Sequence, residues 1–342
     1  MAAPTGFYRL QGALGSPFSM KMRGVLRHRR ISHLWEGGKA GFAAAQAMKA
    51  KVIPVLVFPD GQTENDSTHL IALLEDAHPE RRLTPDDPAA AFLSLLIEDM
   101  ADEWFSKAMY AYRWARPVDQ EQCCRWLAFD VLQGGGAEMI TQMGASFRDR
   151  QIARMERVGC GADARPAIEA SAARIMSALE AHVVEQPYLF GSRPSAADFA
   201  LYGQLTQLAS DPTPQALMRQ SYPWLYRWVL RMDDLSGEPE GGWDDALDAP
   251  VLAVLLAECG THHLPLLVAN ARAVQAGVAS FSHDMDGVAV VQETNRYPVK
   301  CLMTLRAAWA ALPDDARARL KPLLIPANAM SALNAPELEA PR

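Results

Sequence analysis

The chain has 342 residues, of which 49% are hydrophobic, and this is enough for two or three domains with cores of their own. A formal net charge of −7, from 33 Lys and Arg against 40 Asp and Glu, argues against nucleic acid as a general partner. The sequence shows no N-terminal signal pattern and no apolar run of the roughly 18 residues that a membrane span needs. We therefore expect a soluble cytoplasmic protein with no membrane partner.

The cysteines and histidines do not form a recognisable metal or disulfide pattern. The cysteines are odd in number, with two of them adjacent, and predict reduced, mostly buried thiols. His69 and His78 lack Cys or carboxylate partners at ligand spacing, and the His262-His263 pair gives no convincing metal site, so we expect no metal. The five cysteines are Cys123, Cys124, Cys160, Cys259 and Cys301.

The first 59 residues carry an excess of positive charge. They contain nine Lys or Arg residues and a single acidic residue, Glu36. A local field of this sign favours a small anionic ligand, although a solvated helix face explains it equally well.

The first 80 residues alternate strand and helix patterns. A strand at 7–10 precedes a helix that Ser16-Pro17 opens, since Ser is a good N-cap and Pro suits the first turn. Further on, Asp66-Ser67 caps another helix. Between them the pattern predicts strands at 31–35 and 52–58, an Ala-rich helix after Gly37-Gly38, and a hairpin turn at 59–61. The predicted order is β-α-β-α-β-β-α, with a parallel half and an antiparallel edge.

The rest of the chain is mostly helical. A linker is expected at 81–88 and a second boundary at the Gly- and acid-rich stretch 236–248. The last dozen residues, rich in Ala and Pro, are expected to lack structure. Helices are predicted at 89–115, 119–133, 137–158, 165–184, 195–209, 223–233, 249–258, 262–276, 298–311 and 314–324, and a strand at 287–293.

Three short motifs occur in a fixed order, about 38 and 13 residues apart. The first is Gly15-Ser16-Pro17-Phe18-Ser19 at the start of a helix, where N–H groups and the helix dipole stabilise an anion. The second is Val52-Ile53-Pro54-Val55-Leu56, where a proline interrupts a strand. The third is the Asp60-Gly61 turn followed by Asp66-Ser67 at a helix start. A fourth, at 188–199, contains Ser195 and Asp198 in a capping-box pattern.

Together these motifs resemble the glutathione S-transferase superfamily, in its serine-type, bacterial-like form with a long C-terminal extension. The resemblance covers roughly residues 5–235. It implies an α/β thioredoxin-like glutathione-binding domain at 5–80 and an all-α helical-bundle domain at 89–235. A mostly helical extension at 236–342, of unknown role, lies outside it.

The resemblance assigns a role to Ser16. Both positions that hold active thiols in thioredoxin relatives are serine here, Ser16 and Ser19. By resemblance, Ser16 is the catalytic residue, whose hydroxyl hydrogen-bonds the sulfur of glutathione and favours its thiolate, and Ser19 supports it. The sequence does not choose between the two serines as the thiol partner. A plain helix N-cap is the alternative for Ser16.

The other two motifs supply the remaining glutathione contacts. The resemblance implies that the Ile53–Pro54 bond is cis and that the backbone of Ile53 pairs with the cysteinyl part of glutathione. Ser67 and its helix N-terminus are expected to hold the γ-glutamyl carboxylate, and Asp66 the ammonium group. An edge strand with a trans proline, and an ordinary Asp/Ser cap, are the alternatives.

Three further residues are candidates by position. Arg23 follows Ser16 on the same helix and either adds positive potential or is a surface residue. Trp104 and Tyr112 belong to an aromatic-rich helix that, by resemblance, lines a hydrophobic electrophile pocket. Aromatic residues at this density equally indicate a helical core.

The leading hypothesis is an enzyme in which the glutathione thiolate attacks a hydrophobic electrophile, by conjugation or by related lyase, dehalogenation or ether-cleaving chemistry. A non-catalytic scaffold or binding protein with the same fold is the alternative, which the long extension favours. Glutathione-dependent disulfide reduction is disfavoured, because positions 16 and 19 lack cysteine. The resemblance also implies a homodimer.

Overall fold

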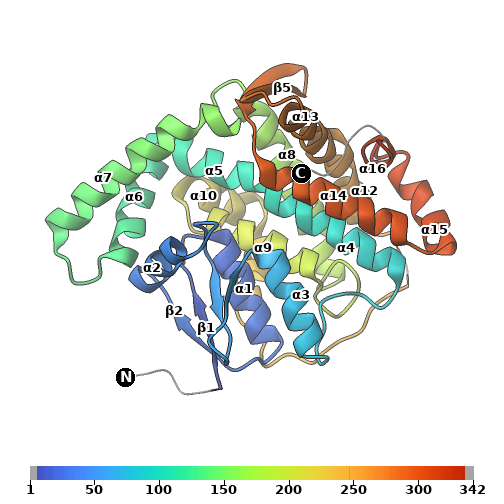
Figure 1. The fold of residues 1–342 in the computed structure, drawn as a ribbon, viewed down its shortest axis with the longest axis horizontal. Helices are drawn as coiled ribbons and strands as arrows, with labels where there is room; N and C mark the ends of the chain where they lie inside the picture. Colours follow the sequence, from blue (N-terminus) through green and yellow to red (C-terminus); the bar gives the residue numbers. More distant parts are fainter. Residues whose placement is uncertain (1–5, 246, 336–342) are drawn as a thin grey trace. The chain divides into compact units, whose positions relative to one another are not determined.

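The computed structural model describes residues 6–245 and 247–335 (Figure 1). It contains two compact units, each assembled from three segments of the chain. Unit 1 comprises Met1–Leu83, Tyr112–Gln151 and Asp198–Glu240, and unit 2 comprises Thr84–Ala111, Ile152–Ala197 and Gly241–Arg342. The division into three contiguous domains at 5–80, 89–235 and 236–342, which the sequence suggests, stays a prediction.

The sheet of unit 1 has four strands in the order β2-β1-β3-β4. β1 pairs in parallel with β2, and β3 is antiparallel to both β1 and β4. Helices α1 and α3 run side by side (Figure 1). The predicted β-α-β-α-β-β-α order is confirmed. Its elements are β1 (Tyr8–Gln11), α1 (Pro17–His28), β2 (His33–Glu36), α2 (Lys39–Ala47), β3 (Val55–Val57), β4 (Thr63–Asn65) and α3 (Ser67–Ala77).

Local sequence explains these elements. Ser16 caps α1, Pro17 occupies its first turn, and the apolar face predicted from the helical period is buried, as Met22, Val25 and Leu26 show. β3 is shorter than predicted, because it starts at Val55 after a proline that has no N–H to donate.

The helices between the sheet and residue 240 largely follow the prediction. One helix was not predicted, α10, because Pro212 and Pro214 suggest a loop. Both prolines lie in its first turn, where helix N–H groups have no intrahelical acceptor, so they are tolerated. The elements are α4 (Pro88–Met100), the π-turn η1 (Ala101–Phe105), α5 (Ser106–Ala115), α6 (Pro117–Val131), α7 (Ala137–Arg154), η2 (Glu156–Val158), α8 (Arg165–Glu185), α9 (Ala196–Leu208), α10 (Pro212–Ser221) and α11 (Pro223–Met232).

The last part of the chain folds into helices and one hairpin. The strand β5 was missed because it is mostly polar, although its side chains alternate between exposed and buried. The expected unstructured end is partly wrong, since α16 forms there, while residues 336–342 lie outside the described residues. The elements are α12 (Pro250–Glu258), the π-turn η3 (Cys259–His263), α13 (Leu264–Gln275), β5 (Ser280–Met285), β6 (Val288–Glu293), α14 (Arg296–Ala311), α15 (Asp314–Leu324) and α16 (Met330–Leu333).

The run Pro250–Gln275 corrects one sequence expectation. It is continuous across η3, and it is long and apolar enough to cross a membrane by length and composition. However, 72% of its most apolar window is buried inside the protein. This is the pattern of a core helix in a globular fold.

Candidate functional site

The three predicted motifs emerge from one edge of the sheet in unit 1. Gln11 is paired with Val55, and Val55 is paired with Asn65, so these residues form one row across three strands. β1 ends at this row, β3 begins there and β4 ends there. Consequently the loop before Ser16, the Ile53-Pro54 segment and the Asp66-Ser67 helix start leave the sheet at the same edge.

The structure distinguishes the two serines of the first motif. The Oγ of Ser16 accepts the N–H of Ser19 at 3.3 Å, so the N-cap interpretation is confirmed, and the residue is half-exposed. A hydroxyl that accepts one bond still has a proton to donate, so capping and ligand binding are compatible. Ser19 is 0% exposed, and its Oγ accepts the N–H of Ala13 at 3.3 Å. Of the two serines, only Ser16 is accessible from outside the protein.

The second motif presents a backbone edge. The Ile53–Pro54 peptide bond is cis, as the resemblance implied. Pro54 is buried and Ile53 is half-buried. Within residues 6–245 and 247–335, neither the N–H nor the C=O of Ile53 has a backbone hydrogen-bond partner. Both groups remain available to pair with a peptide-like ligand in the manner of a strand.

The third motif has unusual backbone geometry. Asp66 has φ 78° and ψ 105°, a conformation that costs free energy in a residue with a Cβ. It caps α3, with its carboxylate accepting the N–H of His69 at 3.5 Å. Ser67 is the first residue of α3 and is buried. Such strain is concentrated at functional sites, and this signal was not visible in the sequence.

Arg23 is engaged elsewhere in unit 1. Its guanidinium donates to Asp233, which also accepts from Arg27 at 2.7 Å and from the hydroxyl of Tyr202 at 3.0 Å. Burial disfavours the charge on Asp233, but the bonds and charges of its partners outweigh burial and hold its pKa below the ordinary value. Arg23 is therefore not a plain surface residue, and its supporting role toward a ligand stays a prediction.

The two candidates for the electrophile pocket are core residues. Trp104 is 2% exposed and donates from Nε1 to the Oγ of Ser171 at 2.8 Å within unit 2. Tyr112 is buried in unit 1, with the guanidinium of Arg116 5.1 Å from its ring centroid. Their burial favours the core interpretation, and the pocket stays a prediction.

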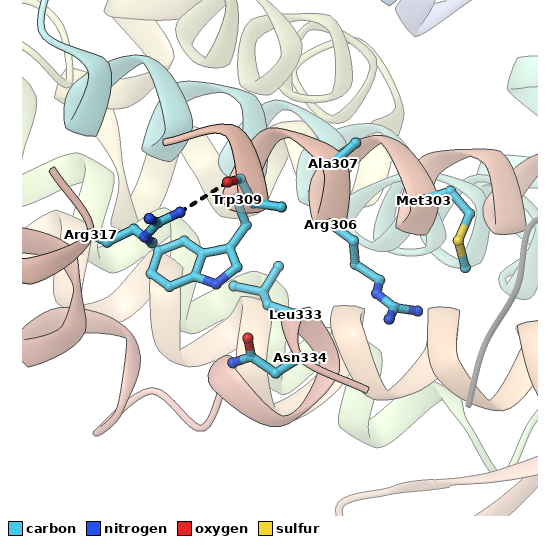
Figure 2. A pocket seen from close by; sticks show the side chains of 8 residues that line it. Met303, Arg306, Ala307, Trp309, Arg317, Leu333 and Asn334 are labelled. Carbon is cyan, nitrogen blue, oxygen red and sulfur yellow. Dashed lines mark hydrogen bonds between the residues drawn. The ribbon is translucent and has the colours of Figure 1, made fainter. Parts of the chain in front are cut away.

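A hollow of about 630 Å³ lies on unit 2 and contains none of the predicted site residues (Figure 2). Arg317 donates to the carbonyl of Ala310 at 2.9 Å, and Arg306 donates to the carbonyl of Ala335. Both guanidinium groups therefore already bond to the protein. The lining consists of Met303, Arg306, Ala307, Trp309, Ala310, Arg317, Leu333 and Asn334.

The cysteines offer no reactive thiolate. All five are buried, and none forms a disulfide. Burial and the nearby carboxylate of Asp211 raise the pKa of Cys123, and burial raises that of Cys124. These protonated thiols do not support disulfide exchange. Residues 6–245 and 247–335 contain no group of three or more His, Cys, Asp or Glu side chains arranged to hold a metal ion.

Three buried polar side chains beside the Ser16 loop were missed from the sequence: Arg113, Gln207 and Asp211. Arg113 donates to the carbonyl of Gly15, and Gln207 donates to that of Leu14. The only sequence signal was a charged residue, Arg113, within an aromatic helix.

Comparison with known proteins gives two domain matches. Residues 10–82 match the N-terminal domain of glutathione S-transferases, and residues 162–231 match their C-terminal domain. No curated protein matches the chain.

Solved structures give distant likenesses. A glutathione S-transferase from Methylobacterium radiotolerans, in complex with glutathione sulfonate, is 18% identical over 70% of this chain and 97% of that one, with a TM-score of 0.41. A glutathione S-transferase from Methylobacillus flagellatus with glutathione bound is 19% identical over 69% of this chain and 99% of that one, with a TM-score of 0.41. A β-etherase from a Sphingobium strain is 16% identical over 73% of this chain and 99% of that one, with a TM-score of 0.44.

The two matched domains occur in the expected order along the chain, and residues 10–82 fold with the expected element order. Residues 232–342 lie outside both matches. The chain belongs to the glutathione S-transferase superfamily.

Proposed function

We propose that this protein is a serine-type glutathione transferase whose site is the sheet edge formed by the three motifs. The observation that carries the proposal is the row Gln11–Val55–Asn65, from which all three motif segments emerge. A half-exposed hydroxyl, a backbone edge without a backbone partner and a helix N-terminus are together suited to a peptide-like thiol with a free carboxylate.

Each group has a defined task in the proposed reaction. The hydroxyl of Ser16 donates to the sulfur of glutathione, which stabilises the thiolate and lowers the thiol pKa. The N–H and C=O of Ile53 pair with the cysteinyl backbone. Ser67 and the N-terminus of α3 bind the γ-glutamyl carboxylate, and Asp66 binds the ammonium group. The thiolate then attacks an electrophilic carbon, a sulfur–carbon bond forms, and the leaving group departs with its electron pair.

The proposal includes the setting of the reaction. The electrophile is a hydrophobic small molecule, and the reaction is conjugation or a related lyase, dehalogenation or ether-cleaving step. The protein is a cytoplasmic homodimer, with neither a metal nor a nucleic acid partner. A monomeric mass in solution would contradict the dimer.

Isothermal titration with reduced glutathione tests the site. We expect binding in the micromolar to low-millimolar range. The Asp66→Ala/Ser67→Ala double variant should bind more weakly, because it loses the groups proposed for the γ-glutamyl end. Wild-type protein that binds nothing at about 10 mM, equivalent to less than about 3 kcal/mol of binding free energy, would remove glutathione from the proposal. A double variant with full affinity would show that the edge is misassigned.

A second candidate is a glutathione-binding protein without turnover. The observation that favours it is the burial of Trp104, which stacks on His262 of the extension instead of facing a ligand. A panel of electrophiles separates the two candidates. Glutathione binding without any conjugation, halide release or ether cleavage would favour the second.

A further inference from the structure

Arg113 is the centre of a buried polar network in unit 1. Its Nε donates to Asp211 Oδ2 at 2.8 Å and its Nη2 donates to Asp211 Oδ1 at 3.1 Å, a two-point ion pair. Nη2 also donates to Gln207 Oε1 at 2.7 Å, and the ring of Trp126 lies 5.2 Å from the guanidinium carbon. The side chains of Arg113 and Asp211 are 4% and 0% exposed.

This network ends on the loop that precedes Ser16. Nη1 of Arg113 donates to the carbonyl of Gly15 at 2.9 Å, and Nε2 of Gln207 donates to the carbonyl of Leu14 at 3.0 Å. The two peptide planes immediately before Ser16 are therefore each held by a buried donor. Both donors come from helices far along the chain, α5 and α9.

The loop needs such an anchor because of Gly15. Glycine samples more backbone conformations than any other residue, so an unanchored loop would let the N-terminus of α1 move. Glycine also leaves room for the neighbouring side chains, since a Cβ there would lie 2.2 Å from a methyl carbon of Leu127 and would require that side chain to shift. The hydrogen bonds to the carbonyls of Leu14 and Gly15 supply the rigidity that a side chain at position 15 would otherwise provide.

A buried ion pair is a poor device for stability alone. The loss of hydration of two buried charges offsets much of their attraction, and well-packed apolar residues do as well or better. What the pair does supply is direction, because a two-point Arg–carboxylate contact fixes the plane of the guanidinium. That plane directs Nη1 at the carbonyl of Gly15.

We propose that Arg113 and Gln207 are positioning residues, which fix the loop before Ser16 so that its hydroxyl faces the glutathione sulfur, with Asp211 orienting Arg113. This inference rests on the proposed transferase function. Neither residue touches the reacting atoms, so the effect of losing either one passes through the conformation of Leu14, Gly15 and Ser16.

The test compares Gln207→Met with Gln204→Met. Both glutamines are buried on α9, and methionine has nearly the same volume and a high helix propensity. The amide of Gln204 has no hydrogen-bond partner within the described residues, so its loss controls for the removal of a buried amide. If Gln207→Met does not fold, Gln207→Glu serves instead, because it keeps the acceptor for Arg113 but has no donor for Leu14.

Two readouts are needed, hydrogen exchange of residues 13–19 without ligand and the pKa of bound glutathione from thiolate absorbance. We expect Gln207→Met to raise loop exchange about tenfold and to raise the pKa of the bound thiol by about one unit, the effect of one lost hydrogen bond. Gln204→Met should change neither.

Each contrary result has a distinct meaning. Wild-type protein that does not bind glutathione overturns the transferase function and this inference with it. If wild type binds but loop exchange in Gln207→Met equals that in Gln204→Met, the inference alone is wrong. The same holds if exchange rises while the pKa of the bound thiol stays at the wild-type value, because the anchor would then be purely structural.

Discussion

The indole of Trp104 lies flat against the imidazole of His262, with ring centroids 4.7 Å apart and planes 5° apart. The same indole donates to Ser171 Oγ, which in turn donates to Glu258 Oε2 at 2.6 Å. Arg174 also donates to Glu258. Trp104, Ser171 and Arg174 belong to helices before residue 240, whereas His262 and Glu258 belong to the extension. The extension is therefore part of the buried interior of unit 2.

Ser171→Ala should lower the free energy of unfolding by about 1–3 kcal/mol, because the buried indole N–H and carboxylate both lose a partner. Denaturant unfolding measures this change. Ser282→Ala, at an exposed position on β5, is the control and should change stability by less than about 0.5 kcal/mol. Equal effects of the two substitutions would mean that the chain of bonds is energetically unimportant.

Stability should fall as the pH drops from 6.5 toward 4, partly because of His283. Burial and the nearby charge of Lys107 lower the pKa of His283 from 6.5 to about 4. In this pH window the His283 side chain binds a proton in the unfolded chain but stays neutral in the folded protein, so lowering the pH favours unfolding. His283→Gln removes this contribution, and its melting temperature should fall less over the window. The exposed His69→Gln should follow wild type, and an identical slope in all three proteins would rule out His283.

Asp233→Asn should destabilise unit 1 by about 2 kcal/mol, because Arg23 and Arg27 lose their shared counter-charge. This is less than for a fully buried pair, since the side chain of Asp233 is 38% exposed. Asp234→Asn, at the exposed neighbouring position, is the control and should destabilise less, because an asparagine keeps an oxygen that can accept the N–H of Ser236.

The effect of Asp233→Asn should also depend on pH. The lowered pKa of Asp233 means that its contribution is present above pH 3.8 and is lost as the pH falls through the folded-state pKa. The free energies of unfolding of wild type and Asp233→Asn, measured at several pH values, should therefore become equal in acid. A constant difference at all pH values would contradict the ionic explanation.

Ser16→Ala should sharply lower turnover while glutathione affinity stays within several-fold, because the hydroxyl acts on the sulfur and the other contacts hold the rest of the molecule. Ser19→Ala should lower turnover far less than Ser16→Ala does and should cost about 1 kcal/mol of stability, for the bond from Ala13. Conjugation rates and thiolate absorbance test both. Unchanged turnover in Ser16→Ala would remove this residue from the mechanism.

Local patterns predicted the N-terminal elements well. The cap at Ser16, the apolar face of α1 and the turn at Asp60-Gly61 each depend on a few neighbouring residues, and local rules suffice for such features. The cis bond before Pro54 came from resemblance, not from periodicity. The capping box of Ser195 and Asp198 stays a prediction, although both residues are buried.

The features that were missed depend on contacts between distant segments. Arg113 and Gly15 are 98 residues apart, and no local rule links a charged residue in an aromatic helix to a loop of that separation. The aromatic residues near Trp104 fit both a pocket and a core by sequence, and the burial of Trp104 and Tyr112, which favours the core, is set by distant segments. Helix α10 was not predicted because its prolines suggest a loop, and strand β5 was not predicted because most of its residues are polar.

The interleaving of the two units limits how this protein can be shortened or recombined. Unit 2 takes its segments from three separate stretches, so any contiguous fragment that contains all of unit 2 also contains two segments of unit 1. A gene fragment ending near residue 240 would encode both matched transferase domains but would expose the indole of Trp104 and leave Arg174 without its carboxylate. We therefore expect the extension to have become indispensable to the fold, and domain swaps with shorter relatives to require redesign of the helix surfaces it covers.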